Sequence, residues 1–362
     1  MALELDDKSW KLAFGTGLGE RARERTVAVR DGRGVLEEIE RAKQRYGLAA
    51  DPRVVSCYEA GREGFWLHRF LVAHGIENVV IDASSIEVNR RSRRPKTDRL
   101  DASRLLERLI KYTAGSKEWR VVRVPSVDEE DARQEHRELE TIKAERTAVS
   151  NRIKGLMATQ GLKVPVTQRF AEELDGLRLW DGSSVPPQLR ARLLREWEHW
   201  RMLTDRQREV EAIRRRALQE RKTTDGAIGQ VDQLRQLRSI GVESATLLIH
   251  EIFSWREIRN RRQLGALGGM TPTPYSSGGT HRELGISKAG NARVRRCMLE
   301  LSWLWLRYQP DSALSKWFEE RFGTGGKRQR KIGIVALARK LLIALWRYLD
   351  QGIVPEGASL KA

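Results

Sequence analysis

Residues 2–14 read ALELDDKSWKLAF, in which two short apolar runs flank a polar turn. Short runs of this kind, bounded by polar turn residues, are typical of β-strands. A third run, TVAV, occupies residues 26–29 after a further polar stretch. We therefore expect the chain to begin with three consecutive strands that form an antiparallel meander.

Helical and strand-like patterns alternate after this meander. Apolar residues recur at helical spacing in residues 35–46 and 65–73, whereas residues 54–58 and 79–81 are short apolar runs typical of strands. Three antiparallel strands followed by alternating helices and strands predict a mixed α/β sheet with helices on its faces. This is the element order of a ribonuclease H type fold.

The middle and C-terminal parts of the sequence are expected to be mostly helical. Charged stretches with apolar residues at steps of three and four occupy residues 128–157 and 189–219, and three prolines lie between them. These stretches predict either a helical hairpin that forms a dimerising, coiled-coil arm or two ordinary amphipathic helices packed inside one domain. Beyond about residue 230 short helices alternate with Gly-rich turns, and a longer helix is expected over residues 291–308.

The composition predicts a basic protein that binds nucleic acid. Of the 362 residues, 67 are Lys or Arg and 49 are Asp or Glu, which gives a formal net charge of +18. Such a surface attracts polyanions in a salt-dependent way. No run approaches about 18 apolar residues and no leader is evident, so we expect a cytoplasmic protein that associates with the nucleoid and has no membrane segment. The 2 cysteines and 6 histidines support neither a disulfide nor a metal site.

Two carboxylates stand three residues apart in the segment KTDRLDA, residues 96–102, at an expected helix start. Asp98 and Asp101 would share one face of that helix, where like charges repel unless a cation lies between them. Glu4 points away from the leucines beside it if its segment is a strand, and Glu59 closes another expected strand. Side chains at strand ends converge in α/β sheets, and Mg²⁺ prefers oxygen ligands. The four acids therefore predict a Mg²⁺ or Mn²⁺ site that faces DNA phosphates.

Each acid also has an ordinary alternative. Asp98 can be a helix N-cap with Asp101 three residues further on, an arrangement that satisfies backbone N–H groups. Glu4 alone can be a solvated strand residue, and Asp6 and Asp7 compete as first ligand although they fall in the polar turn. Together with the expected fold order, the four acids favour the metal site over these alternatives.

Two groups of cations are candidates for contacts with phosphates. Five lie within seven residues before the acidic pair: Arg90, Arg91, Arg93, Arg94 and Lys96. Four more follow a turn-rich loop expected over residues 271–282 (TPTPYSSGGTHR): Lys288, Arg293, Arg295 and Arg296. Basic runs are often only solvated, and Ser-Ser-Gly-Gly is commonly a flexible turn, so composition alone does not make Ser277 catalytic. Cations near a serine would nevertheless stabilise the charge that develops on an attacked phosphate.

Several motifs, in their order and spacing, resemble those of the DEDD transposases, insertion-sequence recombinases that are related to the Piv-type DNA invertases. The motifs are LEL (3–5), WKLAF (10–14), YEAG (58–61), KTDRLDA (96–102), GGMTP (268–272), SG (277–278), ISKAGN (286–291) and ALARKLL (336–342). The resemblance extends over nearly the whole chain, from residue 2 to about residue 349. Each motif alone is modest, whereas their order is specific.

The resemblance implies three domains with separate roles. These are an N-terminal RuvC-like domain whose acids bind magnesium, a coiled-coil arm, and a C-terminal transposase domain that supplies a serine nucleophile. Glu59, Asp98 and Asp101 match the acidic motif, and Ser277, which precedes a glycine, matches the nucleophile. Glu4 stands where the family usually has an aspartate, which lengthens that ligand by one methylene. The expected domains are residues 1–122 (RuvC-like), 123–228 (arm), 229–350 (transposase domain) and 351–362 (tail).

The resemblance also implies a function and partners. Family members use a structured bridge RNA that pairs with donor and target DNA, so that base pairing carries sequence choice. We therefore expect a site-specific recombinase that acts on double-stranded DNA as a dimer or tetramer, with Ser277 forming a covalent phosphoserine link. Because the acids and the serine fall in different domains, we expect each active site to be composite and shared between two protomers. The rival functions are a metal-only, RuvC-like junction nuclease and a non-catalytic nucleic-acid-binding protein.

Overall fold

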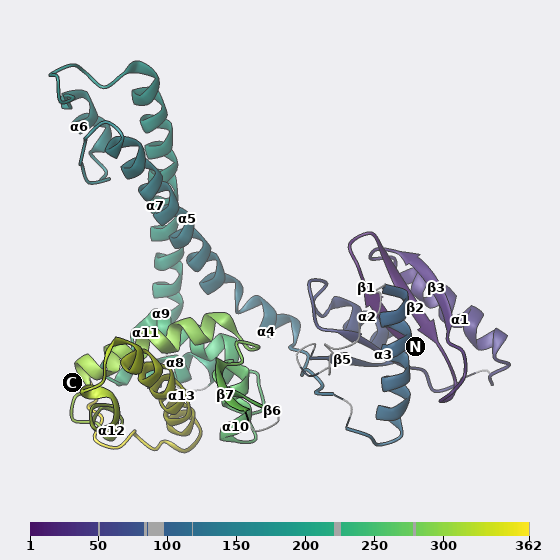
Figure 1. The fold of residues 1–362 in the computed structure, drawn as a ribbon. Helices are drawn as coiled ribbons and strands as arrows, with labels where there is room; N and C mark the ends of the chain where they lie inside the picture. Colours follow the sequence, from purple (N-terminus) through teal and green to yellow (C-terminus); the bar gives the residue numbers. More distant parts are fainter. Residues whose placement is uncertain are drawn as a thin grey trace. The chain divides into compact units, whose positions relative to one another are not determined.

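The computed structural model describes residues 1–49, 51–82, 85, 98–117, 119–220, 226–277 and 280–361. The chain divides into two compact units, Met1–Ser126 and Val127–Ala362 (Figure 1). Among the helices described, none combines the length and the apolar character that crossing a membrane requires.

The first unit contains a five-stranded mixed sheet with the strand order β3-β2-β1-β4-β5. Its strands are β1 (Ala2–Leu5), β2 (Ser9–Phe14), β3 (Arg23–Ala28), β4 (Val55–Glu59) and β5 (Glu77–Ile81). Strand β2 pairs antiparallel with β1 and β3, whereas β4 pairs in parallel with β1 and β5. The expected meander and mixed sheet are therefore confirmed. The assignment to the ribonuclease H or RuvC class stays a prediction.

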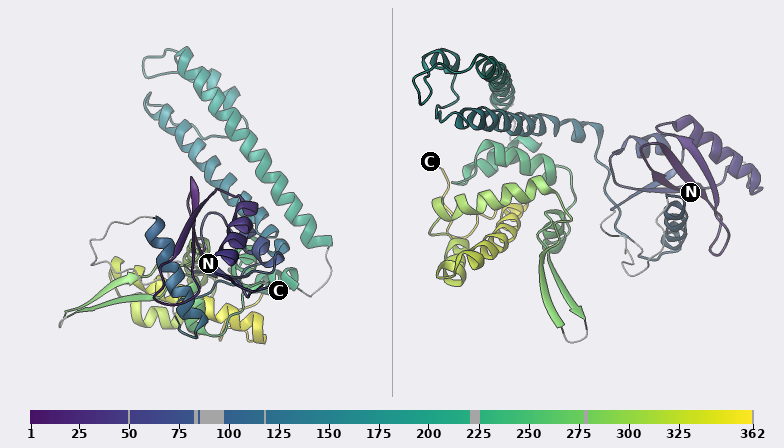
Figure 2. Two further views of the ribbon diagram at one scale, coloured as in Figure 1. Left: turned by 90° about the vertical axis from the view of Figure 1, so that its right-hand side faces the viewer. Right: turned by 45° about the horizontal axis from the view of Figure 1, so that its top comes forward.

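Helices cover both faces of this sheet (Figures 1 and 2). They are α1 (Gly32–Arg45), α2 (Trp66–Ala73) and α3 (Asp98–Thr113). Large side chains fill the face that packs against α1 and α2, among them Leu3, Trp10, Leu12 and Tyr58. The opposite face packs against α3 and carries the small residues Ala2, Ala13 and Cys57. Because these residues are small, they leave room for the larger apolar side chains of α3.

Two long helices of the second unit form a helical hairpin, which we call the arm. After α4 (Val127–Asp131), the chain forms α5 (Gln134–Ala158), α6 (Phe170–Gly176) and α7 (Pro187–Glu220), and α7 packs antiparallel to α5 (Figure 2). Facing apolar residues give the arm its own core: Leu139, Ile142, Val149, Ile153, Met157, Leu193, Trp197, Leu203 and Val210. The expected helical hairpin is confirmed, while its coiled-coil character and its role in dimer formation stay predictions.

The remaining elements of the second unit surround a helical core. They are α8 (Gly226–Gln236), α9 (Val242–Leu248), η2 (Ile249–Phe253), α10 (Arg261–Leu267), β6 (Pro272–Ser277), β7 (Thr280–Ile286), α11 (Ala292–Tyr308), α12 (Ala313–Phe318), η3 (Glu319–Gly323) and α13 (Lys327–Gln351). The elements η2 and η3 are π-helical turns. Core residues come from several of these helices and include Leu234, Leu248, Met298, Trp305 and Leu341. The helix expected over residues 291–308 is confirmed as α11.

The expectation of a turn-rich loop over residues 271–282 is wrong, because this segment belongs to an antiparallel hairpin (Figure 2). Strand β6 pairs with β7, and the last register pair, Ser277 with Thr280, leaves a two-residue connection. The proline and glycine content suggested a loop. In a two-stranded hairpin both strands are edge strands, which tolerate proline, and the register shifts between Pro272 and Pro274.

Candidate functional site

Two of the predicted metal ligands are neighbours in the sheet. In the parallel pair of β1 and β4 the last aligned residues are Leu3 and Tyr58, so the next residues along the two strands are Glu4 and Glu59. Alternation along the strands puts both acids on the face that packs against α3. Both are half-buried and lie at the carboxyl ends of their strands, the edge at which sites form in α/β sheets.

Helix α3 runs antiparallel to β1. Leu106, in the second half of the helix, lies beside Gly15, which follows the last residue of β2. Because β2 is antiparallel to β1, Gly15 marks the amino end of β1. The first turn of α3, which contains Asp98 and Asp101, is therefore directed toward the carboxyl ends of β1 and β4. The sequence anticipated this helix start, and the structure begins α3 at Asp98.

The surroundings of the four acids are only partly described. Asp101 Oδ1 accepts a hydrogen bond from Arg104 Nη1 at 3.4 Å, and Lys11 on β2 lies opposite Glu4. The backbone of Asp98 is helical, and its side chain lies outside the part of the structure that is described. Within the side chains that are described, no group of three or more His, Cys, Asp or Glu could hold a metal ion. The metal site made of all four acids stays a prediction.

One further acid at this end of the sheet was missed. Asp82 directly follows β5, the strand next to β4, and its Oδ2 lies 3.8 Å from Arg120 Nε. The signal in the sequence was an acid that closes the apolar run of residues 79–81. Carboxylates at the ends of adjacent strands offer the oxygen ligands that Mg²⁺ and Mn²⁺ take. Glu4 and Glu59 are oxygen donors of the type that a hard divalent cation takes, whereas alternation along β5 puts Asp82 in line with Val80, on the face that packs against α1 and α2.

Ser277, the predicted nucleophile, is the last residue of β6 in the second unit. It precedes the two-residue connection of the hairpin; its side chain and all of Gly278 lie outside the described part of the structure. At the foot of the hairpin Lys288 has a φ of 56°. Its carbonyl oxygen accepts a hydrogen bond from Arg295 Nη1 at 3.2 Å. The guanidinium of Arg295 thus meets the backbone of Lys288 at the base of the strand pair that carries Ser277.

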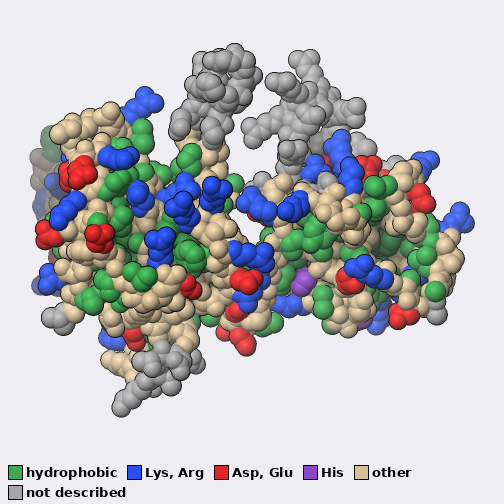
Figure 3. Space-filling model, turned by 90° about the horizontal axis from the view of Figure 1, so that it is seen from below, with side chains coloured by type: hydrophobic (Ala, Val, Ile, Leu, Met, Phe, Trp, Pro, Cys, Tyr) green, Lys and Arg blue, Asp and Glu red, His purple; other side chains and the backbone are tan. Residues whose placement is uncertain are grey.

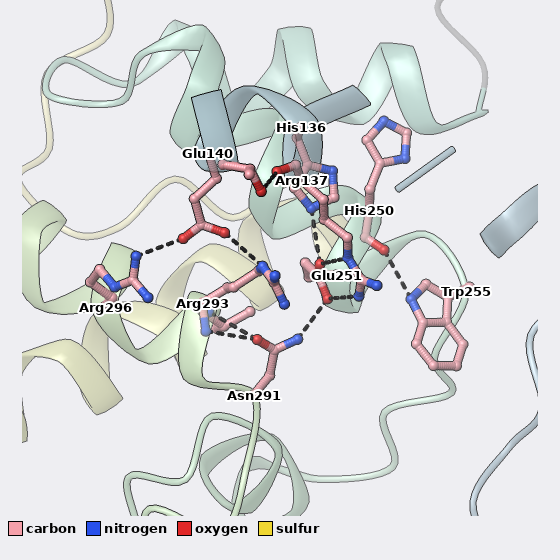
Figure 4. Close-up of polar contacts among 11 residues, drawn as sticks. His136, Arg137, Glu140, His250, Glu251, Trp255, Asn291, Arg293 and Arg296 are labelled. Atoms are coloured by element: carbon pink, nitrogen blue, oxygen red, sulfur yellow. Dashed lines mark hydrogen bonds and ion pairs between the residues drawn. The ribbon is translucent and has the colours of Figure 1, made fainter. Parts of the chain in front are cut away.

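The other cations predicted to bind nucleic acid differ in their surroundings. Arg293 Nε and Arg296 Nη1 each donate to the carboxylate of Glu140 on α5, at 2.6 Å in both cases (Figure 4). These contacts tie the start of α11 to the arm. The five cations of the first group lie outside the described residues: Arg90, Arg91, Arg93, Arg94 and Lys96. Their role stays a prediction.

A buried polar cluster lies where α5 meets η2 and α11, and the sequence reasoning missed it (Figure 4). Its centre is Glu251 on η2, which is 1% exposed. Glu251 Oε1 accepts from His136 Nε2 at 2.9 Å and from Arg137 Nε at 2.7 Å. Glu251 Oε2 accepts from Arg137 Nη2 at 3.0 Å and from Asn291 Nδ2 at 2.7 Å. No local motif announces this cluster, because its members come from three separate segments: His136 and Arg137 lie 115 and 114 residues before Glu251, and Asn291 lies 40 residues after it.

Opposing influences act on the ionisable groups of this cluster. Burial raises the pKa of the Glu251 carboxyl, but hydrogen bonds from His136, Arg137 and Asn291 lower it by more, so that its pKa lies well below the usual value. The neighbouring His250 ring stacks on His136, with 6.2 Å between ring centroids. Burial, followed by the nearby His136, lowers the pKa of His250 to about 4. The cluster therefore contains an ionised Glu251 and a neutral His250 near neutral pH.

The known proteins to which this chain is similar are named as transposases. A protein named "Putative transposase y4rJ" from Sinorhizobium fredii is 39% identical over 374 residues, which cover 100% of this chain and 94% of that protein. The "Transposase for insertion sequence element IS1111A" from Coxiella burnetii is 25% identical over 301 residues, 80% of this chain and 76% of that protein. The similarity defines the class of this protein as an insertion-sequence transposase.

The family follows from the C-terminal unit. Residues 231–316 match the profile of the family described as "Transposase IS116/IS110/IS902 family", a stretch that runs from α8 to α12 and includes the β6–β7 hairpin. With the full-length similarity to the Sinorhizobium protein, this match shows that the chain belongs to the IS116/IS110/IS902 transposase family. The expected resemblance to insertion-sequence transposases is therefore confirmed at the level of the family.

Proposed function

We propose that this transposase is a site-specific recombinase that cuts and rejoins DNA with Ser277 as nucleophile and a divalent cation held by acids of the first unit. Glu4, Glu59, Asp98 and Asp101 would hold Mg²⁺ or Mn²⁺. The observation that carries the proposal is the register of β1 and β4, because it aligns Glu4 with Glu59 at the strand ends toward which the first turn of α3 is directed. Carboxylates that converge at such an edge repel one another unless a cation joins them.

The proposed reaction exchanges one phosphate ester for another. Ser277 Oγ attacks a DNA phosphorus, a new Oγ–P bond forms, and the bond from phosphorus to a deoxyribose oxygen breaks. The serine proton passes to a base in the site, and the leaving oxygen gains a proton. A hydroxyl of another strand then attacks the phosphoserine and releases Ser277. Because the number of phosphate esters is conserved, ATP is not required. A bound cation would neutralise charge that develops on the phosphate oxygens.

Charge and domain organisation support nucleic acid partners. The formal net charge is +18, and Figure 3 shows Lys and Arg side chains spread over both units. We propose that double-stranded donor and target DNA bind this surface, and that a structured bridge RNA selects both by base pairing. The acids belong to the first unit and Ser277 to the second. A dimer or tetramer would allow one protomer to supply the acids and another the serine.

The decisive experiment is to trap the covalent intermediate. Purified protein, with any RNA that copurifies, is incubated with Mg²⁺ and labelled DNA of the element's junction and then denatured. We expect a protein–DNA adduct that survives denaturation, is absent after Ser277→Ala and is retained after Ser276→Ala. Strand cleavage that persists in Ser277→Ala would instead support the metal-only junction nuclease.

The acids give the second test. Asp98→Ala combined with Asp101→Ala is expected to remove both cleavage and adduct while DNA binding persists. Cleavage that is untouched by this double substitution removes the proposed metal site. DNA binding by the wild-type protein without any strand cleavage, with bridge RNA and either metal supplied, would support the non-catalytic alternative.

A further inference from the structure

The buried carboxylate of Glu251 joins the first turn of α5 to Asn291, which follows the end of β7 by five residues (Figure 4). On the arm side, His136 and Arg137 are in the first turn of α5, and together they donate three hydrogen bonds to the carboxylate. Glu251 itself is in the π-helical turn η2, whose wide turn is closed by a hydrogen bond from Ser254 N to Ile249 O at 2.9 Å. Such turns are frequent at functional sites.

On the hairpin side, Asn291 connects Glu251 to the backbone. Its Nδ2 donates to Glu251 Oε2, while its Oδ1 accepts from the backbone N–H groups of Arg293 and Val294 at 2.9 and 3.2 Å and so caps α11. Its own backbone N–H donates to Leu267 O at 2.7 Å. Four hydrogen bonds therefore fix Asn291, and one of them ends on Glu251.

The residues next to Asn291 form the foot of the hairpin, and they are tightly interlocked. A Cβ atom at Gly290 would collide with the backbone of Gly269 and Leu267, so only glycine fits there. Lys288 N donates to Gly269 O at 3.1 Å. One residue closer to the strands, Ser287 N donates to the carbonyl oxygen of the residue that precedes β6, at 2.9 Å. These backbone contacts link Asn291 to the first residues of β6 and the last residues of β7.

We propose that Glu251 is a positioning residue that couples the base of the arm to the foot of the β6–β7 hairpin and thereby sets the place of Ser277. This rests on the proposed function of Ser277. The coupling runs from α5 through the Glu251 carboxylate to Asn291, and from Asn291 to Gly290 and the strands. Glu251 touches no reacting atom in this scheme, and it acts through the orientation of the hairpin.

A pair of exchanged residues tests the coupling. Glu251→Gln removes the charge and replaces one carboxylate oxygen by an NH₂ group. Wherever that NH₂ group points, it faces a hydrogen-bond donor of Asn291 or of Arg137, so that two donors oppose each other. Asn291→Asp keeps the helix cap, because Asp is a good N-cap residue, but it opposes two carboxylates. In the double variant a Gln amide donates to an Asp carboxylate, which restores the hydrogen bond with its polarity reversed. The double variant does not restore the hydrogen bond from Arg137 Nη2. If Glu251 acted only through that hydrogen bond, the double variant would not recover activity.

Two readouts are needed. The first is the single-turnover rate of adduct formation at saturating junction DNA, together with the DNA concentration that gives half of the maximal rate. The second is amide hydrogen exchange of residues 285–291 in the protein without DNA, which follows the foot directly. Glu243→Gln is the matched control, because Glu243 on α9 pairs with Lys143 on α5 and so also ties the arm to the helical core, without touching Asn291.

We expect each single variant to slow adduct formation by roughly 10- to 100-fold, the effect of a misplacement of about 1 Å, with the half-saturating DNA concentration unchanged. Exchange at residues 285–291 should become faster in both single variants. The double variant should recover most of the rate and of the protection, and Glu243→Gln should match the wild type.

Three results would overturn the proposal: no rescue in the double variant, unchanged exchange at the foot in the single variants, or equal losses in Glu243→Gln. If the wild type forms no adduct, the proposed function fails, while the exchange experiment still decides whether Glu251 holds the foot.

Discussion

Glu251 in the second unit differs in burial and in position from Glu4 and Glu59 in the first. Glu251 in the second unit is buried and accepts four hydrogen bonds from His136, Arg137 and Asn291. Glu4 and Glu59 in the first unit are half-buried, lie side by side at the ends of two strands, and share that end with the first turn of α3. A buried carboxylate that accepts four hydrogen bonds supports the fold, whereas the two half-buried carboxylates at the strand ends are the proposed cation ligands. The two regions should therefore respond oppositely to substitution.

The largest effect is expected on activity in the first unit. Glu59→Gln should lower the rate of DNA cleavage on the order of 10³-fold, because it removes a charge that holds the cation near the phosphate. The free energy of unfolding without metal should change by less than about 1 kcal/mol, because Glu59 is only half-buried at its strand end and Gln has nearly the same shape. Single-turnover cleavage and urea unfolding measure the two quantities. A large loss of stability would assign Glu59 to the fold instead.

The reverse result is expected for Glu251. Glu251→Ala leaves Arg137 without its buried carboxylate and should reduce the free energy of unfolding by about 3–5 kcal/mol, as for a broken buried ion pair. Urea unfolding followed by tryptophan fluorescence checks this expectation, since Trp255 Nε1 donates a hydrogen bond to the carbonyl oxygen of His250, the residue before Glu251. A change below about 1 kcal/mol would mean that the cluster contributes little to the fold.

Acid should destabilise the second unit through His250. Its pKa is lowered from 6.5 to about 4, chiefly by burial, so the folded state resists protonation. The contribution to stability is full above pH 6.5 and is lost as the pH falls from 6.5 toward 4, by no more than about 3 kcal/mol. Urea unfolding at a series of pH values measures the slope. His250→Gln should flatten it in this window, whereas protonation of Glu251 acts only at lower pH.

The smallest effect concerns the thiols. Burial raises the pKa of Cys57 and of Cys297 to about 12, so neither forms a thiolate near neutral pH. Both should react with iodoacetamide at pH 8 far more slowly than after unfolding in guanidinium chloride. Mass spectrometry of the native and unfolded protein compares the two. Rapid alkylation of native Cys57 would show that the packing of α3 on the sheet opens readily.

Local patterns predicted the elements better than they predicted the contacts. The expected strand over residues 2–5 coincides with β1, and the helix expected over residues 189–219 differs from α7 by one or two residues at each end. The hairpin was missed because proline and glycine suggest loops, although two edge strands tolerate them. Acid types and strand ends pointed to Glu4 and Glu59, but their alignment depends on register, which local sequence does not specify.

The contacts of the Glu251 cluster could not be predicted from local sequence. His136, Glu251 and Asn291 are unremarkable singly, and only the folded chain brings them together. The glycine at position 290 carried the one available signal, since it lies in the motif ISKAGN, yet the collision that requires it involves backbone atoms of residues 267 and 269.

The length of the arm makes its attachment matter. Helix α7 is 34 residues long without interruption, which at 1.5 Å per residue amounts to about 50 Å. A tilt of about 10° at the base would carry the far end through roughly 9 Å, more than the rise of one helical turn. A force applied at the tip of the arm would therefore act through a long lever on the Glu251 cluster at its base.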